Sequence, residues 1–140
     1  MIVVDTNVAS ELMRPSPSPS VVAWVRASSP PQLHTTAITV AEVLYGIERL
    51  AEGRRRTLLG TTAREVFSSF ADRVLPFDER AAEEYAEIVA AREAGGRPIS
   101  GFDAQIAAIC RGHGATLATR NATDFQETGI VTLNPWIARS

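Results

Sequence analysis

The stretch MIVVDTN, residues 1–7, decides the fold, because three branched apolar residues are followed directly by the carboxylate of Asp5. An apolar run without polar alternation predicts a strand buried on both faces, as in a parallel sheet covered by helices. Ligands of open α/β sheets bind beyond the carboxyl ends of the strands, where Asp5 would lie. Asp5 can equally cap a following helix, since Asp is a good N-cap residue. Asp5 alone does not indicate a functional site, so other acids that could lie close to it are needed.

Strand-like and helix-like segments alternate along the rest of the chain. Further strands are predicted at residues 33–38, 74–77, 116–119 and 130–133, and helices at 7–13, 21–27, 39–52, 54–72, 79–94 and 101–112. Without an internal repeat, this alternation predicts one domain over residues 1–140, of the α/β class. We expect three α/β/α layers, a mainly parallel central sheet and a flavodoxin-like strand order.

Composition places the chain among intracellular proteins. Its one cysteine, Cys110, lies in an apolar segment and predicts a buried, inert thiol instead of a disulfide. No apolar run approaches the length of a membrane span, and the first apolar run ends after four residues without a basic leader. A cytoplasmic location, with no membrane association, is therefore expected.

Charge gives no bulk attraction to nucleic acid, because the net charge is −2. All 14 basic residues are arginine, so mechanisms that need a lysine amine are excluded. The arginine triplet at residues 54–56 fits either an RNA-facing patch or a solvated helix start.

Three other acids lie outside the predicted solvated helix faces: Glu42, Asp103 and Asp124. Each also has a structural interpretation. Thr39 and Glu42 match a capping box, and Ser100 and Asp103 imitate one. Asp124 can be an ordinary turn residue.

Joint placement favours a site. Asp5 and Asp124 follow strands, whereas Glu42 and Asp103 begin helices, and both kinds of position border the same crevice of an α/β sheet. Four carboxylates in one crevice repel unless cations share it. Oxygen ligands without histidine or cysteine indicate Mg²⁺ or Mn²⁺ instead of zinc. Such a site commonly serves phosphoryl transfer, with water as the nucleophile.

Four motifs in this order resemble those of PIN-domain ribonucleases of the VapC toxin type: VDTN (4–7), TVAE (39–42), DAQIAA (103–108) and TRNATDF (119–125). Further segments resemble the FitB branch of that family: the proline-rich loop before VVAW (21–24), LPFD (75–78) and NPW (134–136). The resemblance spans nearly the whole chain.

The resemblance implies an endoribonuclease toxin that uses Mg²⁺ or Mn²⁺ to hydrolyse RNA and leaves 5′-phosphate and 3′-hydroxyl ends. It implies these roles for six residues: Asp5 and Asp103 as principal metal ligands, Glu42 and Asp124 completing the acidic site, and Thr6 and Asn121 as polar support. Whether Asp124 ligates metal stays open, since relatives differ over which residue of this loop carries the acid.

The resemblance also implies partners. These are a VapB-type antitoxin whose C-terminal segment covers the site, a second copy of the chain in a homodimer, and a larger assembly with antitoxin on operator DNA. No feature of the sequence selects an RNA target, because recognition of unpaired RNA depends on surface shape and stacking.

An acid at position 5 also occurs in two other kinds of protein, a phosphoaspartate enzyme and a binding module without catalysis. The sequence argues against the first of these. A phosphoaspartate enzyme normally uses an active-site lysine, which this chain lacks, and residues 5–7 lack the second acid of a D-x-D motif. A catalytically silent PIN-fold protein that only binds an antitoxin or nucleic acid is the main alternative. Metal-dependent cleavage that is lost in Asp5→Asn or Asp103→Asn would distinguish the enzyme from this binding module.

Overall fold

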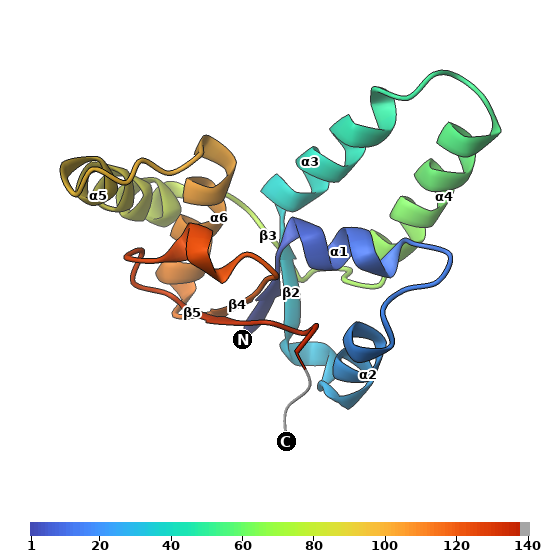
Figure 1. The fold of residues 1–140 in the computed structure, drawn as a ribbon, viewed down its shortest axis with the longest axis horizontal. Coiled ribbons are helices and arrows are strands. Elements are labelled where there is room, and N and C mark those ends of the chain that lie inside the picture. The colour runs from blue at the N-terminus through green and yellow to red at the C-terminus, as the bar shows by residue number, and fades with distance from the viewer. Residues whose placement is uncertain (138–140) are drawn as a thin grey trace.

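The computed structural model describes residues 1–137 as alternating strands and helices (Figure 1). In chain order they are β1 (Ile2–Val4), α1 (Thr6–Leu12), α2 (Pro19–Ala27), the 3-10 helix η1 (Pro30–Gln32), β2 (Leu33–Thr36), α3 (Ala37–Glu48), α4 (Arg54–Ser68), β3 (Val74–Leu75), α5 (Glu79–Ala94), α6 (Gly101–His113), β4 (Thr116–Ala118), the 3-10 helix η2 (Ala122–Phe125) and β5 (Val131–Leu133). None of the helices within residues 1–137 is long and apolar enough to cross a membrane.

The sheet has five parallel strands in the order β3-β2-β1-β4-β5. The predicted α/β class with a parallel central sheet is confirmed. Both β2 and β3 lie on one side of β1, whereas the flavodoxin order places a single strand there. The winding direction reverses between β1 and β4, and a crevice at the carboxyl ends of two such strands is the usual ligand site of a doubly wound sheet.

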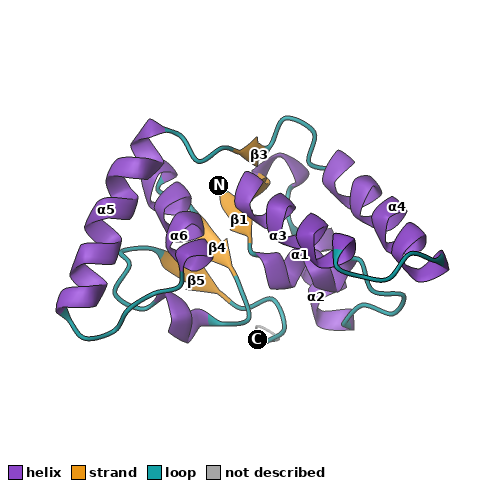
Figure 2. Ribbon diagram, turned by 90° about the horizontal axis from the view of Figure 1, so that it is seen from above, coloured by secondary structure: helices purple, strands orange, loops and turns teal. Residues whose placement is uncertain are grey.

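Strand β1 is buried on both faces, as its apolar run predicts. Val3 belongs to the core cluster that includes Ile88 of α5 and Ile106 of α6. Val4 packs on the other side of the sheet, in the cluster that includes Val8 of α1. Figure 2 shows α5 and α6 on one side of the strands, and α1 and α2 on the other. The residues following β1 are therefore held between two packed layers.

Helices α3 and α4 extend beyond the sheet as a pair (Figure 1). They pack on α1 through a third cluster, which includes Ala9, Met13, Val43 and Ala63. This contact brings the N-terminal turns of α1 and α3 together above the end of β1.

Two helices begin two residues earlier than predicted. Helix α3 begins at Ala37, and its N-cap is Thr36, whose Oγ1 accepts a hydrogen bond from the Thr39 backbone N–H at 3.1 Å. The capping box predicted for Thr39 and Glu42 therefore does not form, because the cap lies three residues earlier. Helix α2 begins at Pro19 instead of after Ser20, since proline is well suited to the first helical position.

Candidate active site

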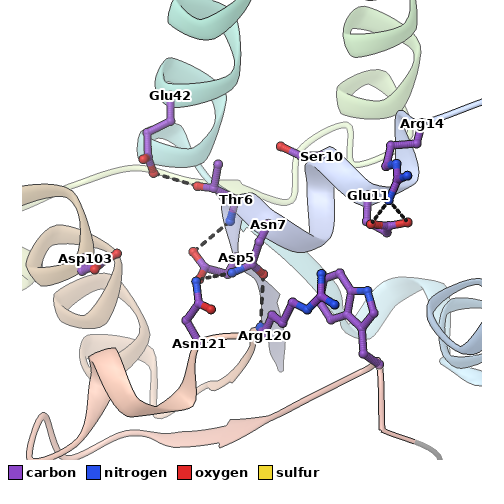
Figure 3. A pocket seen from close by; sticks show the side chains of 11 residues that line it. Asp5, Thr6, Asn7, Ser10, Glu11, Arg14, Glu42, Asp103, Arg120 and Asn121 are labelled. Carbon is purple, nitrogen blue, oxygen red and sulfur yellow. Dashed lines mark hydrogen bonds and ion pairs between the residues drawn. The ribbon is translucent and has the colours of Figure 1, made fainter. Parts of the chain in front are cut away.

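A cavity of about 490 Å³ opens beyond the carboxyl ends of β1 and β4 (Figure 3). Its lining combines acids, small polar side chains, two arginines and an aromatic ring: Asp5, Thr6, Asn7, Ser10, Glu11, Arg14, Glu42, Asp103, Arg120, Asn121 and Trp136. The structure thus brings three of the four predicted acids, and both predicted supporting residues, to one place.

Asp5 is both a helix cap and a cavity residue, so its two interpretations from the sequence are compatible. Its Oδ1 accepts a hydrogen bond from the Thr6 backbone N–H at 2.8 Å, at the start of α1. Its Oδ2 accepts from Thr119 Oγ1 at 2.7 Å and from Asn7 Nδ2 at 3.5 Å. With only 4% of its surface exposed, Asp5 is held in one orientation by three donors.

Glu42 reaches the cavity from the second turn of α3. Thr6 Oγ1 donates a hydrogen bond to Glu42 Oε1 at 2.7 Å and lies 3.2 Å from Thr39 Oγ1. Thr6 therefore links the start of α1, which carries the Asp5 cap, to the carboxylate on α3.

Asp103 lies in the first turn of α6, and Figure 3 shows its carboxylate turned toward the cavity. Ser100 caps this helix as predicted, because its Oγ accepts from the Asp103 backbone N–H at 3.2 Å. The side chain of Asp103 is left to face the cavity at a helix N-terminus, a position that favours an anion.

Asp124 does not line the cavity. It lies in η2 with an exposed side chain, and its backbone carbonyl accepts a hydrogen bond from Arg92 Nη1 at 3.1 Å. Its charge still acts on Asp103, whose pKa it helps to raise. Asn121, at the start of the same segment, lines the cavity, and its backbone N–H donates to Thr119 Oγ1 at 3.1 Å.

Burial and neighbouring negative charges raise the pKa of two cavity carboxyl groups, those of Asp5 and Asp103. Burial raises the pKa of Asp5 to about 6, hydrogen bonds from Thr119 and Thr6 oppose the shift, and the charges of Asp103 and Glu42 add to it. Burial also raises the pKa of Asp103; its hydrogen bond with Ser100 opposes this shift. A cation in the cavity would offset both the burial of the charged carboxylates and the repulsion between them.

The raised pKa of Asp5 predicts a pH-dependent stability in the absence of divalent metal. The folded chain holds this proton up to about pH 6, whereas the unfolded chain releases it near 3.8, so acidification through this window stabilises the fold. A pKa difference of about 2 corresponds to about 3 kcal/mol. Urea unfolding in EDTA should show the wild type losing stability relative to Asp5→Asn by about this amount between about pH 4 and 7. A pH-independent difference between the two would contradict the burial of this carboxyl group.

The donor chemistry of the cavity fits a Mg²⁺-like ion. Its acids offer only oxygen ligands, and neither histidine nor cysteine lines the cavity. Within the part of the chain that the structure describes, no three His, Cys, Asp or Glu side chains are grouped closely enough to hold a metal ion. Mg²⁺ commonly binds through one or two carboxylates and keeps several waters, so an open set of acids suits it better than a closed structural cage would.

Thr119 is a site residue that the sequence reasoning missed. It is fully buried at the end of β4 and donates to Asp5 across the strand pair. Its signal was available in the sequence, because it ends a predicted strand and directly precedes the loop that carries Asn121 and Asp124. Arg120 and Trp136 were also missed, since no pattern in the sequence places residue 136 beside residue 120.

Comparison with known proteins agrees with this fold. The family model described as PIN domain matches residues 2–131. The chain is 41% identical over 137 residues to VapC ribonuclease Y4jK of Sinorhizobium fredii, covering 97% of this chain and 98% of that protein. It is 38% identical over 137 residues to toxin FitB of Neisseria gonorrhoeae, covering 97% and 99%. A solved structure of FitAB bound to a DNA fragment aligns with a TM-score of 0.91 at 37% identity, covering 100% of this chain and 99% of that one.

Proposed function

This chain belongs to the PIN-domain family, and from that premise we propose that it is a metal-dependent endoribonuclease toxin of a VapBC-type toxin–antitoxin module. The observation that carries the proposal is the convergence of Asp5, Glu42 and Asp103, from three separate elements, on one cavity. The ribonuclease and toxin names of the relatives, at about 40% identity over nearly the whole chain, support it. A silent binding module would have no need of a buried Asp5, whose ionised form is further disfavoured by the charges of Asp103 and Glu42.

Asp5 and Asp103 are the residues we assign to holding Mg²⁺ or Mn²⁺, with Glu42 beside them. Bound there, the ion supplies Lewis-acid stabilisation of phosphate charge and makes water a stronger nucleophile near neutral pH. Asp124 borders this site without lining the cavity. Its proposed role is electrostatic, because its negative charge helps to raise the pKa of Asp103.

The protein's own groups fix the geometry in which water attacks phosphorus. Thr119 and the Thr6 backbone N–H hold both oxygens of Asp5, so this carboxylate cannot rotate without losing a hydrogen bond. The Thr6 hydroxyl leaves Glu42 one oxygen free to accept a proton from the attacking water. A bond forms between the water oxygen and phosphorus while the bond from phosphorus to the 3′-oxygen breaks. The 3′-oxygen takes up a proton from solvent and leaves as a 3′-hydroxyl, and the downstream fragment keeps a 5′-phosphate.

An antitoxin segment is the proposed regulator of the site. A second groove between α1, α3 and α4 is continuous with the acid cavity, because Thr6, Ser10 and Glu42 line both. The rest of this groove is largely apolar, with Met13, Val43, Gly46, Ile47, Leu50, Arg55 and Leu59. An extended peptide with apolar side chains would fit the groove and cover the acids at its end. A homodimer that joins antitoxin on operator DNA completes the proposed assembly.

The experiment that tests the function is cleavage of total RNA by the purified chain, freed of any co-purified antitoxin. With Mg²⁺ or Mn²⁺ we expect discrete fragments whose ends carry 5′-phosphate, and with EDTA we expect intact RNA. Sequencing of the fragment ends then identifies the target. Intact RNA under every metal condition, or fragments that persist in EDTA, would contradict the proposal.

A further inference from the structure

The cavity has two chemically different sides. Figure 3 shows Glu42 and Asp103 on one side of Asp5, and Arg14 and Arg120 on the other. Both arginine side chains are exposed, so they can meet a ligand in the cavity. The second side thus presents cationic groups next to the acids that we assign to catalysis.

Arg120 is the more firmly placed of the two arginines. Its guanidinium carbon lies 4.9 Å from the centre of the Trp136 ring, a cation–π contact that fixes the side chain against the cavity wall. Its backbone N–H donates to Asn7 Oδ1 at 3.2 Å, and the Asn7 amide reaches Asp5 Oδ2 at 3.5 Å. One asparagine therefore connects the arginine segment directly to the central acid.

Glu11 orients Arg14 without neutralising this side of the cavity. It is 5% exposed, accepts the Ser18 backbone N–H at 2.8 Å, and pairs with Arg14 Nη1 at 3.2 Å. Within residues 1–137, Arg120 takes part in no ion pair. Two arginines against one buried acid leave a net positive charge beside the acids.

We propose that Arg120, held in place by Trp136 and joined by Arg14, binds a backbone phosphate of the RNA and positions the strand across the acids. The assignment rests on the proposed function. A guanidinium offers a planar fork of donors that suits phosphate, and Arg120 is exposed to a ligand in the cavity. Trp136 acts through Arg120 and is a positioning residue.

RNA binding in EDTA tests the assignment without cleavage. The probe is a fluorescein-labelled, single-stranded RNA of mixed sequence, followed by anisotropy over a range of salt concentrations. Arg120→Gln should weaken binding about tenfold, and it should make the slope of log affinity against log salt shallower by about 0.7. Arg80→Gln, which changes an exposed arginine on α5, is the matched control and should bind as the wild type does.

Variants of Trp136 test how Arg120 is held. Trp136→Phe keeps a ring under the guanidinium and should retain most of the affinity for RNA. Trp136→Leu removes the ring and should lower the affinity to nearly that of Arg120→Gln. Trp24→Leu controls for the loss of a tryptophan from the same core cluster and should leave RNA binding unchanged.

The outcomes separate this inference from the proposed function. Wild type that binds RNA through Arg120 but never cleaves it would overturn the nuclease and leave the phosphate site standing. Equal affinity and equal salt slope for wild type and Arg120→Gln would overturn the phosphate site, whether or not RNA is cleaved.

Discussion

Asp5→Asn is expected to reduce the rate of RNA cleavage at least about a hundredfold, the usual cost of removing one preorganised electrostatic group from an active site. The amide keeps the size and the capping ability of the carboxylate but lacks its charge. Its effect should therefore fall on metal binding and on the chemical step. Single-turnover rates on an RNA that the wild type cleaves provide the measurement.

The control for this variant is its own fold. Since the pKa of Asp5 is raised to about 6, removal of its charge should leave the chain at least as stable as wild type at neutral pH. A normal circular dichroism spectrum and an unchanged or raised melting temperature, together with lost cleavage, support a role in chemistry. Cleavage at the wild-type rate would remove Asp5 from the site.

Arg92→Met is expected to destabilise the chain by about 3 kcal/mol, because three backbone carbonyl groups lose the charged donor that a buried side chain supplies. Arg92 is 5% exposed. Its guanidinium donates to the carbonyl oxygens of Arg97 at 2.6 Å, Asp124 at 3.1 Å and Gln126 at 2.7 Å. The variant should also reduce cleavage, since the segment that carries Asp124 loses its attachment to α5. Urea unfolding and cleavage rates measure the two effects.

Arg97→Met is the matched control for Arg92→Met. Arg97 is exposed, and among residues 1–137 its side chain pairs at the surface with Gln126 and Glu127. Surface pairs of this kind contribute between about 0 and 1 kcal/mol. Equal losses of stability in the two variants would show that the buried guanidinium is not what secures this loop.

The central strand and its acid were predictable from seven residues. A run of apolar residues that ends in Asp5 predicts a central strand of an α/β sheet. In the structure this strand, β1, is buried on both faces. The start of α3 was placed two residues late, because the β-branched residues before Thr39 favour a strand. The cap depends on the extended backbone of Thr36 and its buried hydroxyl, which only the sheet contact defines.

The sequence predicted that three of the acids would lie together, and it did not predict the arginine side of the cavity. The common location of Asp5, Glu42 and Asp103 follows from one rule: the ends of strands and the starts of helices border the same crevice of an α/β sheet. Asp124 obeys the same rule but lies in a 3-10 turn, where its exposed side chain does not line the cavity. The contact of Arg120 with Trp136 joins the end of β4 to the residues after β5, and only the pairing of these two strands brings them together.

The most direct test of the account is to measure Mn²⁺ binding to the antitoxin-free chain by calorimetry. Four proteins are compared: the wild type, Asp5→Asn, Asp103→Asn and the surface control Asp72→Asn. We expect the wild type and Asp72→Asn to bind with equal affinity, and the two cavity variants to bind at least about tenfold more weakly, or about 1.4 kcal/mol. Identical isotherms for all four proteins would contradict the claim that these acids form one metal-dependent catalytic centre.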